Sequence, residues 1–528
     1  MEFKNLKKIT LFCTSIFMFF IICFVFVSIL QNKEIKTHAL SAESVESVQK
    51  NIHKNTNLEN STITSDTTIE AGEIVNNVIV ESGTVNIKGT VNNLIVYSGI
   101  VNIYDKGTIS GTVIFVGNPT KTILNVQSGG RIIDELIIAN ADVTIEAGAT
   151  VQDILLENEE VRDTVHLDIM GTVTGNIILK NRGTSCVCNL SGSIDGMIQS
   201  IGSIVNIKSN VRVQNVLVTS NAHIGKVNVQ SNAIIESIEV TVYGGNFGEL
   251  TVESNATVNT LKVAGGIVNI QSNATIENAT VLGYEGYFGE LTIEAGASVK
   301  TLNLKGGSVD IAGSIETVIT TDGAINLLEG GAITNLTIAG KVDLGSGANA
   351  SGGNISKVVI HETGILTLWD TIKIKDIIND GKLNVAGHID FIQNTTSGIL
   401  QVKRGAKIVS LESAGKTVVN AGADINSLKI NGGHTYIQQS AIIRNATLHN
   451  GILESDNKEN IGNLVCNAGT FIDHTKQSHP IQSHPMQSLW IYIIISGILG
   501  AIIVGLIVCI IVFLHKKRKK NKSIYCIK

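Results

Sequence analysis

Residues 75–87 read VNNVIVESGTVNI, and residues 91–103 repeat this phrase as VNNLIVYSGIVNI. The phrase recurs, with drift, until about Gly462. Self-similarity at a short, fixed period indicates a solenoid, in which each unit packs only on its two neighbours. The length of 528 residues therefore does not imply several separate domains.

Each unit contains two short runs in which apolar and polar residues alternate, joined by turns rich in Gly, Ser and Asn. Alternation with a period of two is the signature of a β-strand, and no run has the three-four spacing of a helix. Between Val75 and Ile461 we place the starts of 21 units over 386 residues, or about 19 residues each. The prediction is an all-β chain that forms a single right-handed parallel β-helix of about 21 coils.

The composition agrees with this architecture. Proline is nearly absent, at 3 residues, whereas glycine is common, at 52. Leucine-rich and ankyrin repeats need helical spacing, and a propeller needs about 40 residues per blade, so these architectures are excluded. In a β-helix the inward Val and Ile columns stack continuously, and aligned residues such as Asn86 and Asn102 can form hydrogen-bonded ladders. Coils about 4.8 Å apart give a rod on the order of 100 Å long.

Both ends of the chain are hydrophobic. Residues 9–30 form an uncharged run behind a basic start, which is typical of a signal peptide, with a cleavage site at 37–39, or of an uncleaved anchor. Residues 489–514 form a second uncharged run, long enough to span a bilayer as a helix. The residues that define this span are Leu489, the interfacial Trp490 and Tyr492, Leu514, and the stop-transfer residues Lys516, Lys517, Arg518, Lys519 and Lys520.

These features predict a single-pass type I protein of the plasma membrane, with the β-helix extracellular and the C-terminal tail cytoplasmic. Small residues spaced by four in the span, such as Ser496 and Gly500, permit a homodimer through the membrane helix. The predicted segments are a signal peptide or signal anchor at 1–42, a polar leader at 43–66, the repeat array at 67–472, a stalk at 473–488, the transmembrane helix at 489–514 and a basic tail at 515–528.

Between its hydrophobic ends the chain is acidic. Residues 31–514 contain 30 basic and 44 acidic residues, a net charge of −14. Nucleic acids and anionic lipids are bound by cationic clusters, so we expect no nucleic-acid partner for the rod. The Gly-Gly-x-Gly-x-Asp nonapeptides of calcium-binding β-helices are missing from the sequence, and we predict no cofactor.

The sequence also contains a second repeat with a longer period. The phrase that begins at Tyr243 and contains Phe247-Gly248-Glu249-Leu250-Thr251 reappears 41 residues later, from Tyr284, with Phe288-Gly289-Glu290-Leu291-Thr292. We interpret this echo as a duplication of two coils.

The array, over residues 67–472, resembles the β-helical passenger regions of bacterial surface adhesins of the autotransporter type. The resemblance is carried by the spacing of about nineteen residues and by turns such as those at 294–297 and 329–332. It implies a rod that adheres to other surfaces without performing chemistry. The sequence departs from that family at its end, where a single helix with a basic tail replaces the membrane barrel of autotransporters.

Three of the seven cysteines lie in the array. Alignment with the repeat places Cys186, Cys188 and Cys466 at inward positions. Cys188 and Cys466 are about fifteen coils apart, and two thiols separated by one residue on a strand are too far apart for a relaxed disulfide. We therefore expect all three to fill the core.

The best local arrangement for catalysis is His361-Glu362 together with Trp369-Asp370. An exposed tryptophan can stack on a sugar, whereas the structural alternative is a loop tryptophan packed on a neighbouring coil. No convergent set of acids is evident, and arginine is rare, so we predict no catalytic residues and no enzyme activity. Adhesion or a surface-structural role through polyvalent contact with a glycan or protein is the predicted function. A polysaccharide lyase or hydrolase and a self-assembling scaffold are the alternatives.

Overall fold

The computed structural model describes residues 60–116, 122–158, 164–181, 186–220, 225–243, 245–284, 286–344, 353–369 and 372–476. The predicted signal segment, the membrane span from Leu489 to Leu514 and the stop-transfer residues lie outside this part of the chain. Within it, no helix has the length and hydropathy needed to cross a membrane. The chain divides into two units, 1–455 with 459–472 and 456–458 with 473–528, and the array of strands belongs to the first.

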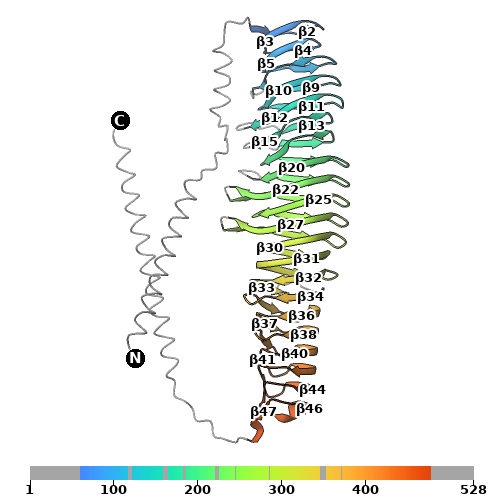
Figure 1. Ribbon diagram of the computed structural model, residues 1–528. Helices are drawn as coiled ribbons and strands as arrows, with labels where there is room; N and C mark the ends of the chain where they lie inside the picture. Colours follow the sequence, from blue (N-terminus) through green and yellow to red (C-terminus); the bar gives the residue numbers. More distant parts are fainter. Residues whose placement is uncertain are drawn as a thin grey trace, which may run out of the picture. The chain divides into compact units, whose positions relative to one another are not determined.

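Each coil of the array has a long limb and a short limb. Strands β3 (Ile74–Val80) and β4 (Thr84–Ile87) form one coil, and each pairs in parallel with the equivalent strand of the next coil. Because every limb repeats this pairing, about 21 turns stack into one continuous parallel β-solenoid (Figure 1). The predicted repeat and parallel coil stacking are confirmed.

The long limbs of successive coils are strands of two to ten residues, some of them broken in two. These are β1 (Asn60–Ile63), β3, β5 (Thr90–Val96), β7 (Thr108–Ile109) with β8 (Val113–Phe115), β10 (Arg131–Ile138), β12 (Thr150–Asn158), β14 (Thr172–Val173) with β15 (Ile177–Asn181), β17 (Ser193–Ile194) with β18 (Met197–Ile201), β20 (Arg212–Thr219), β22 (Ile234–Tyr243), β25 (Thr257–Ala264), β27 (Thr275–Tyr284), β32 (Ala332–Ile338), β34 (Asn354–Ile360), β36 (Lys373–Asn379), β38 (His388–Asn394), β40 (Lys407–Ser413), β42 (Asp424–Ile430), β44 (Ile442–Leu448) and β46 (Ile461–Cys466).

The short limbs are strands of three to five residues. These are β2 (Thr67–Ile69), β4, β6 (Ile100–Ile103), β9 (Thr122–Val126), β11 (Ala141–Ile145), β13 (Val165–Ile169), β16 (Cys186–Leu190), β19 (Ile204–Ile207), β21 (Lys226–Val229), β24 (Glu249–Val252), β26 (Ile267–Ile270), β29 (Glu290–Ile293), β33 (Lys341–Leu344), β35 (Ile365–Leu368), β37 (Lys382–Val385), β39 (Ile399–Val402), β41 (Lys416–Val419), β43 (His434–Ile437), β45 (Ile452–Ser455) and β47 (Thr470–Asp473). Strands β30 (Ser298–Ile311) and β31 (Ser314–Leu327) run through both limbs, and the remaining elements are β23 (Asn246–Phe247), β28 (Tyr287–Phe288), η1 (Lys458–Asn460) and η2 (His474–Lys476).

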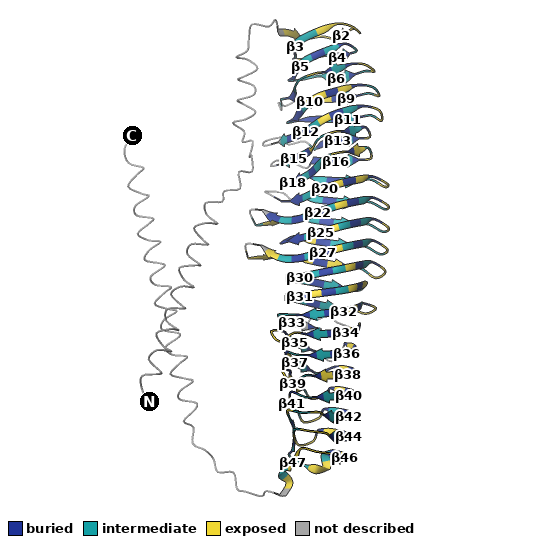
Figure 2. Cartoon of the chain, viewed as in Figure 1, coloured by how far each residue is buried: buried dark blue, intermediate teal, exposed yellow. Residues whose placement is uncertain are grey.

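Aliphatic side chains fill the interior of the rod. Val78 and Val80 in β3 stack on Leu94 and Val96 in β5, and all four are fully buried. Burial of each such side chain contributes about 1.5–3 kcal/mol, so the columns supply most of the folding free energy. Figure 2 shows these buried residues along the limbs, while exposed residues concentrate at the corners.

The corners depend on residues that tolerate a left-handed backbone. At the corner between long and short limbs, Gly99 has a φ of 109°, and a Cβ there would lie 2.3 Å from the carbonyl oxygen of Gly83 in the coil before. At the opposite corner Asn210, Asn232 and Asn255 have φ values of 63–67°. Asparagine is among the few residues with a side chain that adopt this conformation, which explains the recurrent Ser-Asn turns.

Asparagine side chains form hydrogen-bonded ladders on the outer face of the short limbs. The amide of Asn102 donates to Asn86 and that of Asn125 donates to Asn102, each at 2.9 Å. A second ladder continues through Asn189, Asn206 and Asn228. The predicted ladder at Asn86 and Asn102 is therefore confirmed.

A different ladder lies inside the C-terminal coils, at positions filled by aliphatic residues elsewhere. Asn379 and Asn394 are buried, and the amide of Asn379 donates to the Asn394 carbonyl oxygen at 2.7 Å. The Asn394 amide reaches Thr417 Oγ1 at 3.1 Å, and that hydroxyl lies 2.8 Å from the Ser413 hydroxyl. This internal polar ladder was not predicted from the sequence.

Candidate functional site

The structure does not bring together the residues that formed the best local arrangement for catalysis in the sequence. His361 and Glu362 follow β34 at the corner before β35, whereas Trp369 follows β35 at the other corner. The intervening strand separates them by more than about 13 Å. Asp370 lies outside the described residues. Within the described part of the chain, no group of three or more His, Cys, Asp or Glu side chains is placed to hold a metal ion.

Trp369 is half-exposed, and its ring faces the cation of Lys403, whose Nζ lies 5.8 Å from the ring centroid. Lys403 follows β39, two coils after the coil of Trp369. Ala386 occupies the equivalent position on the coil between them. The contact between the indole and Lys403 therefore runs parallel to the rod axis and passes over this coil. This agrees with the structural alternative of a loop tryptophan that packs on neighbouring coils, but it leaves nearly half of the ring open to solvent.

Two of the array cysteines are core residues and the third is not. Cys186 and Cys188 are fully buried in β16, as predicted. Burial raises the pKa of the Cys186 thiol to about 12 and raises that of Cys188 well above its usual range. The prediction of burial is wrong for Cys466. It occupies the inward column beyond Leu448, but it is exposed because no further strand of the described residues stacks on β46.

The duplicated phrase builds two hairpins that project from the same side of the rod (Figure 1). In the first, β22 continues past its long limb and returns antiparallel as β23. In the second, β27 returns as β28. One plain coil, with β25, lies between them, so the hairpins are two coils apart. Each turn contains a glycine of positive φ, Gly245 at 87° and Gly286 at 86°, as two-residue hairpin turns require.

The hairpins concentrate the aromatic side chains of the array. Residues 60–476 contain 12 aromatic residues, and five of them lie in the two hairpins. Phe247 of the first hairpin and Tyr287 of the second form an edge-to-face pair, with ring centroids 5.7 Å apart and an interplanar angle of 81°. Phe288 is beside Tyr287 in sequence and is 62% exposed. We call Phe247, Tyr287 and Phe288 the aromatic patch.

The plain coil between the hairpins is shaped to accept the aromatic patch. Gly265 has a φ of 82°, and a Cβ there would lie 3.2 Å from the Tyr287 Cβ and 3.1 Å from Val242. A larger residue would therefore push the second hairpin away from the rod. Beside the hairpin bases, Ile267 is 40% exposed and pairs between Glu249 and Glu290. Large rings next to carboxylates are suited to a ligand with both apolar faces and hydrogen-bond donors.

No protein-family model matches the sequence, and no curated protein matches it either. Function is therefore inferred from the surface of the rod.

Sequence reasoning found the duplication but not the hairpins. The echo at Tyr243 and Tyr284 was interpreted as a duplication of two coils, and in the structure both copies form the same kind of hairpin. The signal for the hairpins was coil length, because Ile235 to Val258 and Ile276 to Val299 each span 23 residues, whereas Val258 to Ile276 spans 18. The extra residues in both long coils lie around a glycine flanked by aromatic residues, and this pattern would have predicted an excursion from the rod.

Proposed function

We propose that this chain is a non-catalytic adhesive rod, anchored to the plasma membrane by the predicted span at 489–514 and displayed outside the cell. The observation that carries the proposal is the aromatic patch. Solvent-exposed aromatic rings on a rigid support lose little conformational entropy on binding and are the side chains most often found at binding hot spots. The β-solenoid supplies the rigid support because every coil is hydrogen-bonded to both neighbours.

Adhesion is favoured over catalysis by the placement of polar groups. The carboxylates nearest the patch, Glu249 and Glu290, belong to separate strands with Ile267 between them. Lys226 lies 3.6 Å from Glu249 as an ion pair. A retaining or inverting glycosidase needs two carboxyl groups that face one bond across a cleft. The patch instead protrudes, which suits contact with a large partner.

The decisive experiment displays the full chain on cells and measures their attachment to immobilised glycans, matrix proteins and other cells, with sugar release assayed in the same wells. We expect saturable attachment without product. A triple variant, Phe247→Ala with Tyr287→Ala and Phe288→Ala, should weaken attachment by about thirtyfold or more. Ile133→Ala with Ile442→Ala is the matched control, because both isoleucines are 50% exposed and lie outside the patch.

Three outcomes would contradict the proposal. Release of sugar would assign an enzyme and make His361 and Glu362 the first residues to substitute. Equal attachment by the triple variant and the control would remove the patch from the binding surface. A C-terminal tag that antibodies reach on intact cells would refute the predicted type I topology, since the residues Lys516 to Lys520 should keep the tail in the cytoplasm.

A further inference from the structure

The charge of the rod reverses near its C-terminal end. Residues 59–353 contain 14 basic and 30 acidic residues, a net charge of −16. Residues 354–416 contain 8 basic and 6 acidic residues, a net charge of +2. The basic residues of this shorter segment are Lys357, Lys373, Lys375, Lys382, Lys403, Arg404, Lys407 and Lys416.

Four lysines in the acidic part of the rod form an ion pair with a carboxylate on an adjacent coil. Lys88 lies 3.3 Å from Glu70, Lys262 lies 2.7 Å from Glu239, and Lys300 lies 2.8 Å from Glu277. None of the eight cations of the basic segment has an ion-pair partner among the described residues. These cations therefore have no close counter-charge among the described residues, and an anionic ligand would supply one.

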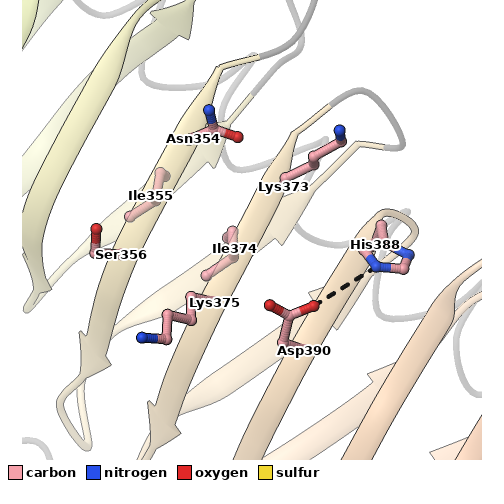
Figure 3. A pocket seen from close by; sticks show the side chains of 8 residues that line it. All are labelled: Asn354, Ile355, Ser356, Lys373, Ile374, Lys375, His388 and Asp390. Carbon is pink, nitrogen blue, oxygen red and sulfur yellow. Dashed lines mark ion pairs between the residues drawn. The ribbon is translucent and has the colours of Figure 1, made fainter.

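Two of these lysines, Lys373 and Lys375, border one hollow on the outer face of β34, β36 and β38. The first residues of these strands and of β40 form a column, in which Asn354 pairs with Lys373, Lys373 with His388, and His388 with Lys407. The third residues of β34, β36 and β38 are Ser356, Lys375 and Asp390. The hollow has a volume of about 350 Å³ and is lined by both rows from β34 to β38 (Figure 3), while Lys407 continues the first row beyond its edge. We call it the cationic groove.

The interior of the groove mixes charge with neutral hydrogen-bonding groups. His388 Nε2 lies 3.6 Å from Asp390 Oδ1, and both side chains are about half-exposed. At the corner before β36, the half-exposed ring of Trp369 forms a cation–π contact with Lys403. Arg404 follows Lys403 at the corner that leads to Lys407 and is exposed as well. An aromatic face therefore lies in the corner that leads into the groove.

We propose that the cationic groove binds an acidic polysaccharide, a linear chain of sugars that bear carboxylate or sulfate groups. Lys373, Lys375 and Lys407 pair with the acidic groups along the chain. Asn354, Ser356 and Asp390 exchange hydrogen bonds with the sugar hydroxyls, and Trp369 stacks on a sugar ring. Lys373 and Lys407 lie two coils apart, about 10 Å along the rod, in the column that His388 links, so the polymer lies along the axis of the rod.

The composition of the groove favours a sugar polymer over a nucleic acid or a membrane. Asn354, Ser356 and Asp390 can accept hydrogen bonds from the hydroxyl groups that a polysaccharide presents on its sugars, whereas phosphate dominates the contacts of a nucleic acid and has no donor to offer them. The strong negative charge of residues 59–353 also repels a duplex or an anionic bilayer that extends beyond the groove. A flexible polysaccharide chain can leave the surface at the ends of the basic segment, which a stiff duplex or a bilayer cannot do.

The test uses the purified full chain in detergent and immobilised heparin and polygalacturonate, with neutral dextran as the reference polymer. We expect binding to both acidic polymers, weakened by added salt, and none to dextran. The triple variant Lys373→Gln, Lys375→Gln and Lys407→Gln should lose affinity by about tenfold or more, because it removes three charge contacts with the polymer. Trp369→Ala should weaken binding further.

The matched control is Lys88→Gln with Lys262→Gln and Lys300→Gln, which removes the same charge from lysines that are already paired. Equal affinity of the two triple variants would overturn the proposal, as would equal binding to dextran. Tighter binding of duplex DNA or phosphatidylserine vesicles than of either polysaccharide would assign a different partner and overturn it too. The proposal does not depend on the aromatic patch, since the patch variant should bind both acidic polymers as the unmodified chain does.

Discussion

The asparagines of the outer and inner ladders make similar hydrogen bonds in opposite surroundings. Outside, Asn102 and Asn125 donate at 2.9 Å along partly exposed short limbs. Inside, Asn379 donates to Asn394 at 2.7 Å where neither side chain meets solvent. Water can replace a lost partner only at the outer ladder. Loss of the hydrogen bond should therefore cost little stability on the surface and much more in the interior. The array cysteines differ in the same way, because Cys186 and Cys188 are buried and Cys466 is exposed.

The largest expected effect is on cysteine reactivity. Burial holds the pKa of Cys186 at about 12, so its thiolate is scarce at pH 8, whereas Cys466 is exposed. We expect iodoacetamide to modify Cys466 about a thousandfold faster than Cys186 or Cys188 in the folded chain, with the difference abolished in denaturant. Mass spectrometry of timed, quenched samples measures the three rates. Comparable rates in the folded chain would mean that β16 is open to solvent.

The same pKa predicts how stability depends on pH. A thiol whose pKa is raised on folding binds its proton more tightly in the folded chain than in the unfolded one. The folded state therefore loses stability as the pH rises above about 8.5 towards 12. Cys186→Ser should remove part of that pH dependence, but Cys466→Ser should not, and urea unfolding at a series of pH values distinguishes the two. An equal effect of both variants would contradict the assignment of Cys186 to the interior.

The second effect is at the inner ladder. Asn394→Ala removes the acceptor of the Asn379 amide and leaves a cavity beside Ser413 and Thr417. A buried unsatisfied donor together with a cavity should cost about 3 kcal/mol. The loss should be local, since each coil contacts only its neighbours. Hydrogen exchange of the amides in β38 and β40 measures it, and unchanged protection there would show that the ladder does not stabilise these coils.

The smallest effect is at the outer ladder. Asn102→Ala breaks the hydrogen bonds to Asn86 and Asn125, but water can solvate the groups left behind. The expected cost is about 0.5–1 kcal/mol, measured by hydrogen exchange in β4, β6 and β9. A loss as large as that of Asn394→Ala would show that the two ladders are equivalent and would remove the contrast between inside and outside.

Most of the fold could be predicted from the sequence, because a parallel solenoid repeats one pattern in every coil. The alternation of residues such as Val78 and Val80 sets which side chains face inward, and the shared register places Asn86 beside Asn102. Features that depart from the coil repeat were not predicted. The hairpins bearing Phe247 and Phe288 are antiparallel excursions, and a repeat alignment treats their residues as extra turn length.

The missed features of the interior and of the binding surfaces have separate causes. Asn379 and Asn394 occupy inward positions where the pattern predicts aliphatic residues, so only the packed structure shows that the Asn379 amide donates to Asn394 and the Asn394 amide to Thr417. Cys466 has the inward register, but no strand of the described residues covers it. The cationic groove combines residues from three coils, and its charge is hidden by the acidic average of the whole rod.

The corners at Gly99 and at the left-handed asparagines have a consequence for how such a chain changes over generations. Because the backbone of each such corner contacts only the coils before and after it, a whole coil can be gained or lost without disturbing backbone contacts farther away. The two matching hairpins are what a duplication of two coils would leave. A lineage could therefore lengthen or shorten the reach between the aromatic patch and the cationic groove in steps of one coil, while both surfaces keep their chemistry unchanged.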